Sequence, residues 1–353
     1  MPSAVPETLP PEEPVLLGPV ERIFWLLEEN SVGSFRVTLV LRLDGCIEAN
    51  LLTAALRRLQ CRHPKLRAVI VKGSDGRLRY QFDRLAPPIP LEISDHDEVE
   101  FPWRQTARRL MESGFPPAGP LIAVNVLRSR SRGCCELLLS VHHAVADGLS
   151  SIMLVEDLLT EYARGEVDPE VAPRPVLAAV TAISAKTSGG WSGRLWLLRR
   201  LRRMIREDRA ARHTSLPETR GIPSQSQWVH WVFSRENTLE LIRRCRRERV
   251  SLGAALEAAV FCGLIDCLPF SKALFKCTFP FDLREALAGP VGRITPQDLG
   301  CFVSIMNEYY EVGKKLPFWD LARRAHQNHQ TFVKCGGPAF YYNLAALAAF
   351  IDK

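Results

Sequence analysis

The sequence predicts an α/β protein of two lobes, with mixed sheets flanked by helices. Three observations lead to this prediction. Strand-like and helix-like segments alternate over most of the chain. Its 353 residues are enough for two lobes with a large buried core. A proline-rich stretch followed by a strongly basic one separates two series of elements near the middle of the chain.

Composition shifts divide the chain into four expected segments. Residues 1–14 are rich in proline and acidic residues, which predicts a disordered leader. The first lobe is expected over residues 15–185 and the second over residues 225–353, with a basic connection at 186–224. A content of 46% hydrophobic and 24% charged residues is typical of a soluble globular protein.

The elements of the first lobe are predicted from periodicity. Alternating or β-branched segments predict strands, and apolar residues three or four positions apart predict helices. Pro64 breaks the first helix, because proline lacks the N–H that the helix needs. The predicted strands are residues 35–43, 66–71, 78–82, 121–127 and 136–141, and the predicted helices are residues 47–59, 103–114 and 149–163.

The second lobe is predicted in the same way. We expect a strand at 228–233, a buried strand at 273–279, and helices at 237–249, 252–264 and 318–333. Ser251 is a suitable N-cap for the second of these helices. His326 and His329 lie three residues apart on the last helix. Since no acidic partner is evident, we interpret them as surface or packing residues rather than as metal ligands.

The basic segment from Lys186 to Arg220 contains ten Lys or Arg and three acidic residues, so its net charge of +7 equals that of the whole chain. Between Trp191 and Arg206, apolar residues and arginines are interleaved, which predicts a basic amphipathic helix. Residues 191–212 could contact an anionic partner: a membrane surface, a carrier-protein phosphopantetheine or the phosphates of coenzyme A. They could equally connect the lobes with one solvated basic face. No nucleic-acid-binding motif accompanies this local charge, so nucleic acid is not an expected partner.

The ten cysteines are irregularly spaced and include no Cys-x-x-Cys pair. This pattern favours reduced thiols and a cytoplasmic location, with peripheral membrane attachment as a further option for the basic segment. The chain has no P-loop, no dinucleotide-binding glycine fingerprint and no Gly-x-Ser-x-Gly elbow. These absences argue against nucleotide-dependent enzymes and serine hydrolases.

The strongest candidate for a functional site is the stretch from Ser140 to Gly148, which joins a predicted strand to a predicted helix. Neighbouring side chains on a strand point to opposite faces. Hence, if His143 faces a cavity, His142 faces packing, or the reverse. A buried Asp147 could fix the turn by accepting N–H groups or by pairing with a cation. Gly148 is expected to adopt a backbone conformation that a residue with Cβ would resist.

A metal site is the main alternative for this stretch, since His and Asp are good zinc ligands. Strand alternation argues against both histidines binding one ion, and no further ligand is grouped nearby. We therefore predict no metal here. A histidine with a purely structural role is the other alternative.

The pattern His-His-x-x-x-Asp-Gly resembles the motif of the chloramphenicol-acetyltransferase-like acyltransferases, which include condensation domains. Two other segments support this resemblance: residues 56–67, similar to the family's "L..RHP.LR", and residues 280–284, Pro-Phe-Asp-Leu-Arg, similar to "PVDLR". The last is typical of the free-standing, polyketide-associated branch of the phthiocerol dimycocerosyl transferase type. Residues 299–304 also resemble a "GCF" segment of the family.

The resemblance implies a two-lobe chloramphenicol-acetyltransferase-like fold and an O-acyltransferase. His143 matches the catalytic histidine, with His142 as the adjacent motif residue. Asp147 matches a structural aspartate that pairs with Arg284 and shapes the site. The backbone N–H of Gly148 is the candidate oxyanion donor. No cofactor is implied; acyl-CoA or an acylated phosphopantetheine is the co-substrate and donor.

The chain departs from the family pattern in one respect: it has no Asp-Phe-Gly-Trp-Gly motif. We therefore expect the second lobe to be truncated or divergent. The expected reaction moves an acyl group from a thioester, on coenzyme A or an acyl carrier protein, to an alcohol in lipid or polyketide biosynthesis. The alternatives are an amide-forming condensation domain, with an amine as acceptor, and a non-catalytic docking module that keeps the motif. The sequence does not fix the oligomeric state.

Overall fold

The computed structural model describes residues 13–30, 35–82, 86–97, 102–116, 119–165, 173–174, 190–210, 230–284 and 298–351. The expected leader, except residues 13 and 14, lies outside these ranges. So do the expected boundaries of the basic connection, at 185/186 and 224/225. The lobe limits therefore remain predictions.

Helices and strands alternate over most of the chain. The helices are α1 (Pro19–Asn30), α2 (Ala49–Arg62), α3 (Trp103–Glu112), α4 (Gly148–Ala163), α5 (Gly190–Ala210), α6 (Arg235–Arg247), α7 (Leu252–Cys267), α9 (Phe318–Lys334) and α10 (Gly337–Ile351), with a short 3-10 helix, η1 (Pro64–Arg67). The strands are β1 (Val15–Leu16), β2 (Arg36–Asp44), β3 (Ala68–Lys72), β4 (Leu78–Phe82), β5 (Leu91–Asp95), β6 (Ile122–Ser129), β7 (Cys134–His142), β8 (Lys272–Asp282) and β9 (Val303–Gly313).

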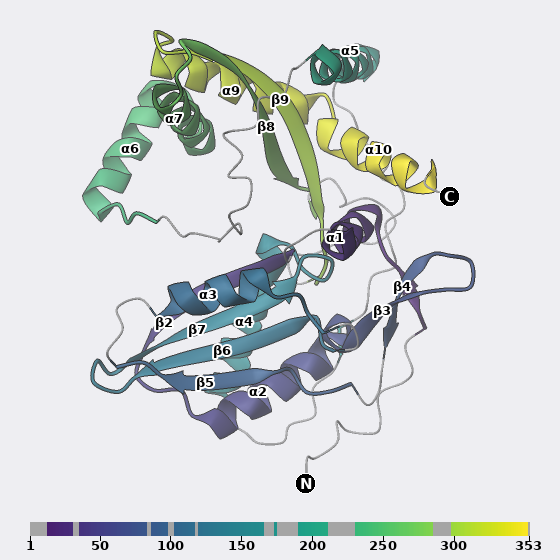
Figure 1. The fold of residues 1–353 in the computed structure, drawn as a ribbon, viewed down its shortest axis with the longest axis vertical. Helices are drawn as coiled ribbons and strands as arrows, with labels where there is room; N and C mark the ends of the chain where they lie inside the picture. The colour runs from purple at the N-terminus through teal and green to yellow at the C-terminus, as the bar shows by residue number, and fades with distance from the viewer. Residues whose placement is uncertain are drawn as a thin grey trace.

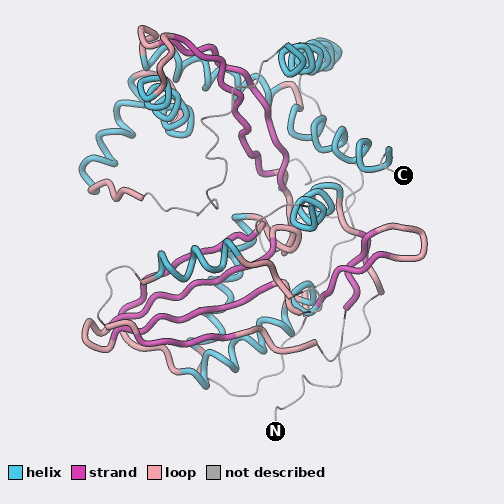
Figure 2. The backbone as a smooth tube through the Cα atoms, in the orientation of Figure 1, coloured by secondary structure: helices cyan, strands magenta, loops and turns pink. Residues whose placement is uncertain are grey.

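The described strands form sheets in the orders β1-β4-β3, β2-β7-β6-β5 and β8-β9. In the second sheet β5 runs parallel to β6, whereas the other neighbours are antiparallel. Figure 1 and the backbone tube in Figure 2 show the first two sheets in one half of the molecule and the long β8-β9 hairpin in the other. The predicted α/β class with a mixed sheet is confirmed.

The central sheet of the first half is covered on both faces. Along β7, Leu137 and Leu139 belong to the main core, which also contains apolar residues of α2 and α4. Leu138 points to the other face, where it packs with Ala107 and Leu110 of α3. A strand buried on both faces reads as a continuous apolar run. This explains the sequence Leu-Leu-Leu immediately before the histidine motif.

In the second half, α7 and α9 pack together against the β8-β9 hairpin. Phe261 of α7 and Leu321 of α9 share a core with Tyr310 of β9. Lower on the hairpin, Leu197 of α5 joins Met306 of β9 and residues of α9 and α10 in a separate cluster. Ser251 caps α7, since its hydroxyl accepts a hydrogen bond from the Ala254 N–H at 3.3 Å.

Three predicted elements differ from the structure. Residues 230–233 are not a strand, because no neighbouring strand pairs with them, and Trp231 and Val232 are exposed. β8 was expected to be buried, yet its residues alternate between exposed and half-buried, because helices cover one face of the hairpin. The predicted strand at 66–71 begins only at Ala68, since residues 64–67 form η1.

Helices α6 and α7 together have the length and apolar composition of a membrane span, but the chain bends by 99° between them. Among the described residues, no single helix is long and apolar enough to cross a membrane.

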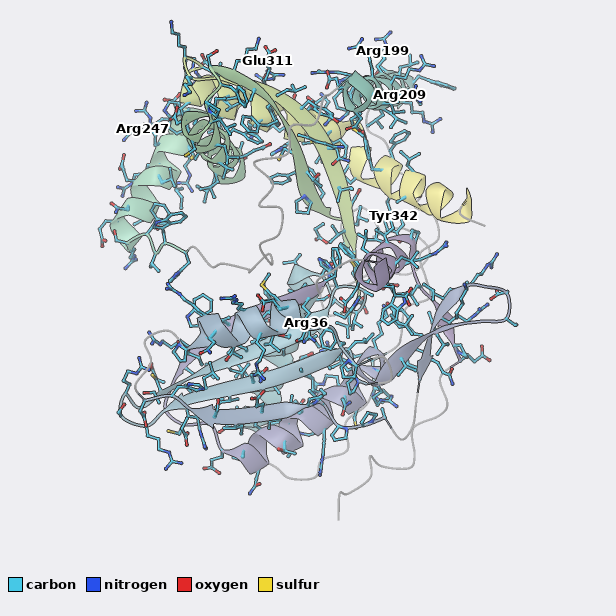
Figure 3. All side chains as sticks on the ribbon, viewed as in Figure 1. Arg36, Arg199, Arg209, Arg247, Glu311 and Tyr342 are labelled. Atoms are coloured by element: carbon cyan, nitrogen blue, oxygen red, sulfur yellow. The ribbon has the colours of Figure 1, made fainter. Side chains whose placement is uncertain are left out.

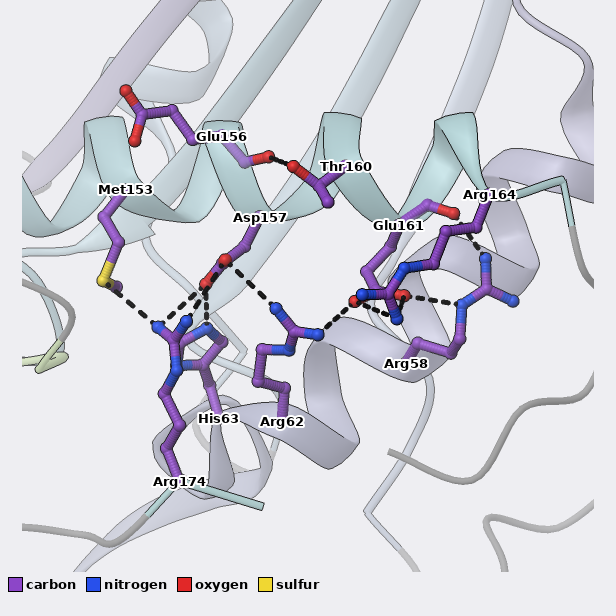
Figure 4. A network of polar contacts seen from close by, with 10 residues as sticks. All are labelled: Arg58, Arg62, His63, Met153, Glu156, Asp157, Thr160, Glu161, Arg164 and Arg174. Atoms are coloured by element: carbon purple, nitrogen blue, oxygen red, sulfur yellow. Dashed lines mark hydrogen bonds and ion pairs between the residues drawn. The ribbon is translucent and has the colours of Figure 1, made fainter. Parts of the chain in front are cut away.

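A buried ionic network joins α2 to α4 behind the central sheet (Figure 4). Arg58 donates from Nε to Glu161 Oε2 at 3.0 Å, and Arg62 Nη2 lies 2.5 Å from Glu161 Oε1. One turn earlier on α4, Asp157 Oδ2 lies 2.7 Å from His63 Nε2 and 3.0 Å from Arg174 Nη1. Arg58 and Glu161 are almost fully buried. This network therefore fixes α4, whose first residues follow the histidine motif.

Replacing Glu161 with Ala should destabilise the protein by about 3–5 kcal/mol, because Arg58 would remain buried without its carboxylate. Glu156→Ala, on the exposed face of the same helix, is the matched control and should change the free energy of unfolding by less than about 0.5 kcal/mol. Urea denaturation of both variants measures the difference. Equal stability of the two variants would contradict this role of the network.

Candidate active site

The histidine motif lies where β7 ends and α4 begins. His142 is the last residue of β7, residues 143–145 form a turn, and α4 starts at Gly148. The backbone holds this junction on two sides: the His143 N–H donates to the Phe35 carbonyl at 2.8 Å, and the His142 N–H donates to the Leu121 carbonyl at 2.8 Å. The motif is therefore attached to the rigid central sheet.

His142 faces the interior and is fully buried. Its ring lies near the rings of Trp25 and Phe115, at centroid distances of 5.3 and 6.0 Å. Nδ1 accepts a hydrogen bond from the Ala144 N–H at 2.9 Å. The proton of the neutral ring is thus on Nε2, 3.2 Å from Glu28 Oε2. Burial lowers the pKa of His142 to about 4, against the opposing effect of Glu28, so the ring is neutral near pH 7.

His143 is only partly buried, in contrast to its neighbour. Its ring is stacked on Phe24 of α1, with centroids 3.9 Å apart and planes 9° apart. Nδ1 lies 3.7 Å from the Cys301 sulfur. The two adjacent histidines thus differ in exposure as strand alternation predicts: one is enclosed in packing, and the other reaches solvent.

The protonation of His143 suits a base. Burial lowers its pKa below the usual value, although a hydrogen bond to its own backbone carbonyl and the charge of Asp147 oppose this shift. Nδ1 is the ring nitrogen that faces Cys301, and among the described residues no hydrogen bond to Nε2 is recorded. Burial also raises the pKa of Cys301 well above its usual value, so the group facing Nδ1 is a neutral thiol.

Asp147 is enclosed by donors and does not contact His143 through any recorded hydrogen bond. Its carboxylate forms a two-pronged pair with Arg284: Nη2 lies 3.0 Å from Oδ1, and Nη1 lies 3.0 Å from Oδ2. The N–H groups of Ser150 and Phe302 also donate to it, at 2.8 and 2.9 Å. This geometry suits a structural aspartate rather than a proton relay.

Arg284 and its surroundings connect the two halves of the chain. Its guanidinium also donates to Asp282 Oδ1 and to Ser150 Oγ, both at 2.8 Å. Burial works to lower the pKa of Arg284, but Asp147 and Asp282 raise it by more. Ser150 Oγ in turn donates to the Gly300 carbonyl at 2.8 Å. The structure therefore brings the predicted Asp147 and Arg284 together within one buried hydrogen-bond network.

Gly148 differs from its expected backbone role. It is the first residue of α4, it is exposed, and its φ is not in the positive range that favours glycine. A Cβ built at this position would meet nothing within 4 Å. Glycine is therefore not required by the backbone or by packing. Its N–H is one of the unsatisfied donors of a helix start, and its role as an oxyanion donor remains a prediction.

The site contains residues that sequence reasoning did not single out. Phe24 and Glu28 come from α1, a helix that was not predicted, although Val20, Phe24 and Leu27 have helical apolar spacing. Cys301 lies within the "GCF" segment, which carried a family signal but no assigned role. Ser150 could have been noticed as a small polar residue in the first turn after the motif.

No group of three or more metal-ligating side chains comes together in the part of the chain that the structure describes. His329 is largely buried and lies against Phe279, with ring centroids 4.3 Å apart. Its Nε2 is 3.1 Å from Glu257 Oε2, an acidic partner that the sequence did not reveal. His326 accepts a hydrogen bond from the Ser251 N–H.

Known proteins resemble this chain in sequence. A family model described as the condensation domain matches residues 15–176. The phthiocerol/phthiodiolone dimycocerosyl transferase of Mycobacterium tuberculosis is 24% identical over 293 residues, which are 81% of this chain and 66% of that protein. The probable non-canonical nonribosomal peptide synthetase CymA of Salinispora arenicola is 32% identical over 174 residues, 48% of this chain but only 2% of the synthetase.

Solved structures resemble the chain over most of its length. Polyketide synthase associated protein 5 from Mycobacterium tuberculosis has a TM-score of 0.62 at 20% identity, covering 93% of this chain and 75% of that one. The first condensation domain of the calcium-dependent antibiotic synthetase has a TM-score of 0.65 at 16% identity, covering 92% and 75%. The resemblance and the α/β fold class predicted from the sequence are confirmed: residues 15–176 match the condensation-domain model, and the fold is similar to that of solved condensation domains over most of the chain.

Proposed function

We propose that this chain transfers an acyl group from a thioester to a hydroxyl group, with His143 as general base. The observation that carries the proposal is the state of the His143 ring. It is partly exposed, neutral near pH 7, fixed by stacking on Phe24, and oriented with Nδ1 already engaged. A base needs a free lone pair and a proton affinity near the working pH. We assign this role to Nε2, the ring nitrogen that does not face Cys301.

The reaction follows from this geometry. Nε2 removes the proton of the acceptor hydroxyl as the oxygen attacks the thioester carbonyl. The tetrahedral intermediate then collapses, the C–S bond breaks, and the imidazolium returns the proton to the departing thiolate. The products are an ester and a free thiol. The charge of Asp147 favours the imidazolium that forms in between, and the Gly148 N–H is the proposed donor to the oxyanion.

A second candidate is amide formation, with an amine as acceptor and an acylated carrier protein as donor. The match of residues 15–176 to the condensation domain favours it, and the same base would serve both acceptors. A third candidate is a docking module that keeps the fold without turnover. Ester formation in lipid or polyketide biosynthesis is our first choice, because the matched dimycocerosyl transferase covers far more of this chain than the synthetases do.

The test is a screen of donors and acceptors. Acyl-CoA and acylated carrier protein are each offered with a panel of alcohols and amines, thiol release is followed, and products are identified by mass spectrometry. We expect thiol release that depends on an alcohol, with an ester as product. Amide products alone would favour the second candidate, and no acceptor-dependent release with any donor would favour the docking module.

His143→Ala should lower kcat by at least about 100-fold, since a general base typically contributes a factor of about 10²–10⁴. The thermal midpoint should change little, because the side chain is only partly buried. His96→Ala, near the end of β5, is the control and should keep the wild-type rate. Wild-type turnover by the His143 variant would refute the base assignment.

The pH profile should reflect the lowered pKa of His143. A lowered pKa keeps the ring unprotonated to more acidic pH, so activity should persist below pH 6.5, the usual histidine value. It should then fall as the pH drops through the folded pKa. The acidic limb of kcat/KM measures this value. If the midpoint of this acidic limb lies above pH 6.5, the assignment of His143 as the base is contradicted.

Asp147→Ala and Arg284→Ala should each destabilise the protein by about 3–5 kcal/mol, because each leaves a buried charge without its partner. The two side chains are 2% and 8% exposed. In a double-mutant cycle the effects should be non-additive, with the double variant less destabilised than the sum of the single ones. Denaturant unfolding gives the three values, and additive effects would exclude an energetic coupling between them.

A further inference from the structure

The outer face of α5 carries a line of exposed apolar side chains. Trp191, Leu195, Leu198 and Ile205 are 81%, 51%, 45% and 43% exposed. Their spacing of four, three and seven residues places them on one side of a helix. At 1.5 Å per residue this line is about 21 Å long. It is an unusual surface for a helix that already has a buried side.

Arginines surround this line. Of the seven arginines of α5, Arg200 and Arg203 are paired with Glu308 and Glu207. The other five, all exposed, are Arg194, Arg199, Arg202, Arg206 and Arg209. Within the described ranges no ion pair is recorded for these five, and the guanidinium of Arg194 lies 5.6 Å from the Trp191 ring centroid. Figure 3 shows Arg199 and Arg209 on α5 at the periphery of the molecule.

The opposite face of α5 holds the helix in this orientation. Leu197 is buried in a cluster with Met306 and Phe332, and Arg200 pairs with Glu308 below it. Near the end of the helix, Asp208 accepts a hydrogen bond from Lys276 of β8 at 2.8 Å. The helix cannot turn its apolar line inward without breaking these contacts. The arginine-flanked line is therefore a fixed feature of the surface.

We propose that this face of α5 docks on the surface of a lipid bilayer that contains anionic lipids. A straight line of apolar side chains fits a planar interface, where tryptophan is favoured at the level of the headgroups. The flanking guanidinium groups can bind lipid phosphates, often through two hydrogen bonds each. The surface thus matches both the apolar and the anionic parts of such a bilayer.

Two other occupants fit less well. An acidic carrier protein would complement the arginines, but it would leave the apolar line without an equally apolar partner. A second copy of the same face would bring five arginines against five, which is unfavourable. Membrane docking is independent of the identity of the acyl acceptor, so it can be tested without an active-site assay.

Vesicle flotation tests the proposal with the full chain. Vesicles of phosphatidylcholine with 30% phosphatidylglycerol should bind the protein at least tenfold more tightly than pure phosphatidylcholine, and added salt should weaken the binding because it screens charge. The combined Arg199→Glu, Arg202→Glu and Arg206→Glu variant should lose at least tenfold in affinity. Trp191→Ala should also weaken binding, because it removes the most exposed apolar side chain.

The matched control is the combined Arg243→Glu, Arg246→Glu and Arg247→Glu variant of α6, which makes the same change of charge on another exposed helix face. It should bind the anionic vesicles within threefold of the wild type. Circular dichroism should show that all variants are folded. Equal loss in both triple variants, equal binding to neutral vesicles, or carrier-protein binding without vesicle binding would each overturn the proposal. If the α5 triple variant unfolds, the Trp191→Ala comparison alone decides.

Discussion

The pairing of Asp147 with Arg284 is the interaction on which the arrangement of the site depends. It joins the start of α4, in the first half of the chain, to the residues that follow β8, in the second. Both side chains are buried, so neither charge can be exposed to water without opening the interface. Because the same carboxylate also accepts the N–H groups of Ser150 and Phe302, it fixes the helix start and the segment that faces His143.

The different environments of the two histidines follow from their position at the end of β7, where successive side chains point in opposite directions. His142 keeps the side-chain direction of Leu138 and Ser140 and is enclosed between α1 and the central sheet. His143 begins the turn and reaches solvent. Its Nδ1 faces the Cys301 sulfur at 3.7 Å, and its ring is stacked on Phe24. The first half of the chain holds the imidazole in a fixed orientation, while the second half supplies the thiol and backbone beside it.

Much of the fold and of the candidate site could be predicted from the sequence, because both depend on local residue patterns. The Leu-Leu-Leu strand was predicted from its residue pattern, whereas the roles within the motif and the Arg284 segment were identified through the resemblance to the acyltransferase family. The predictions that were wrong or missing concern features that depend on contacts between residues distant in the sequence. Residues 230–233 alternate like a strand but lack a strand to pair with. Phe24 and Glu28 matter only because α1 folds against His143 and His142. Gly148 was expected to be needed for its conformation, yet its φ is ordinary.

The segment that ends at Phe302 has a consequence for motion. In sequence it leads into β9 and the second half, yet Gly300 and Phe302 are bonded to Ser150 and Asp147 at the start of α4. Cys301, which lies between them, is therefore held beside His143 by contacts to the first half of the chain. Any hinge that lets the hairpin swing away would lie beyond this segment. Such a swing would leave the imidazole and its neighbouring thiol at the same distance from each other.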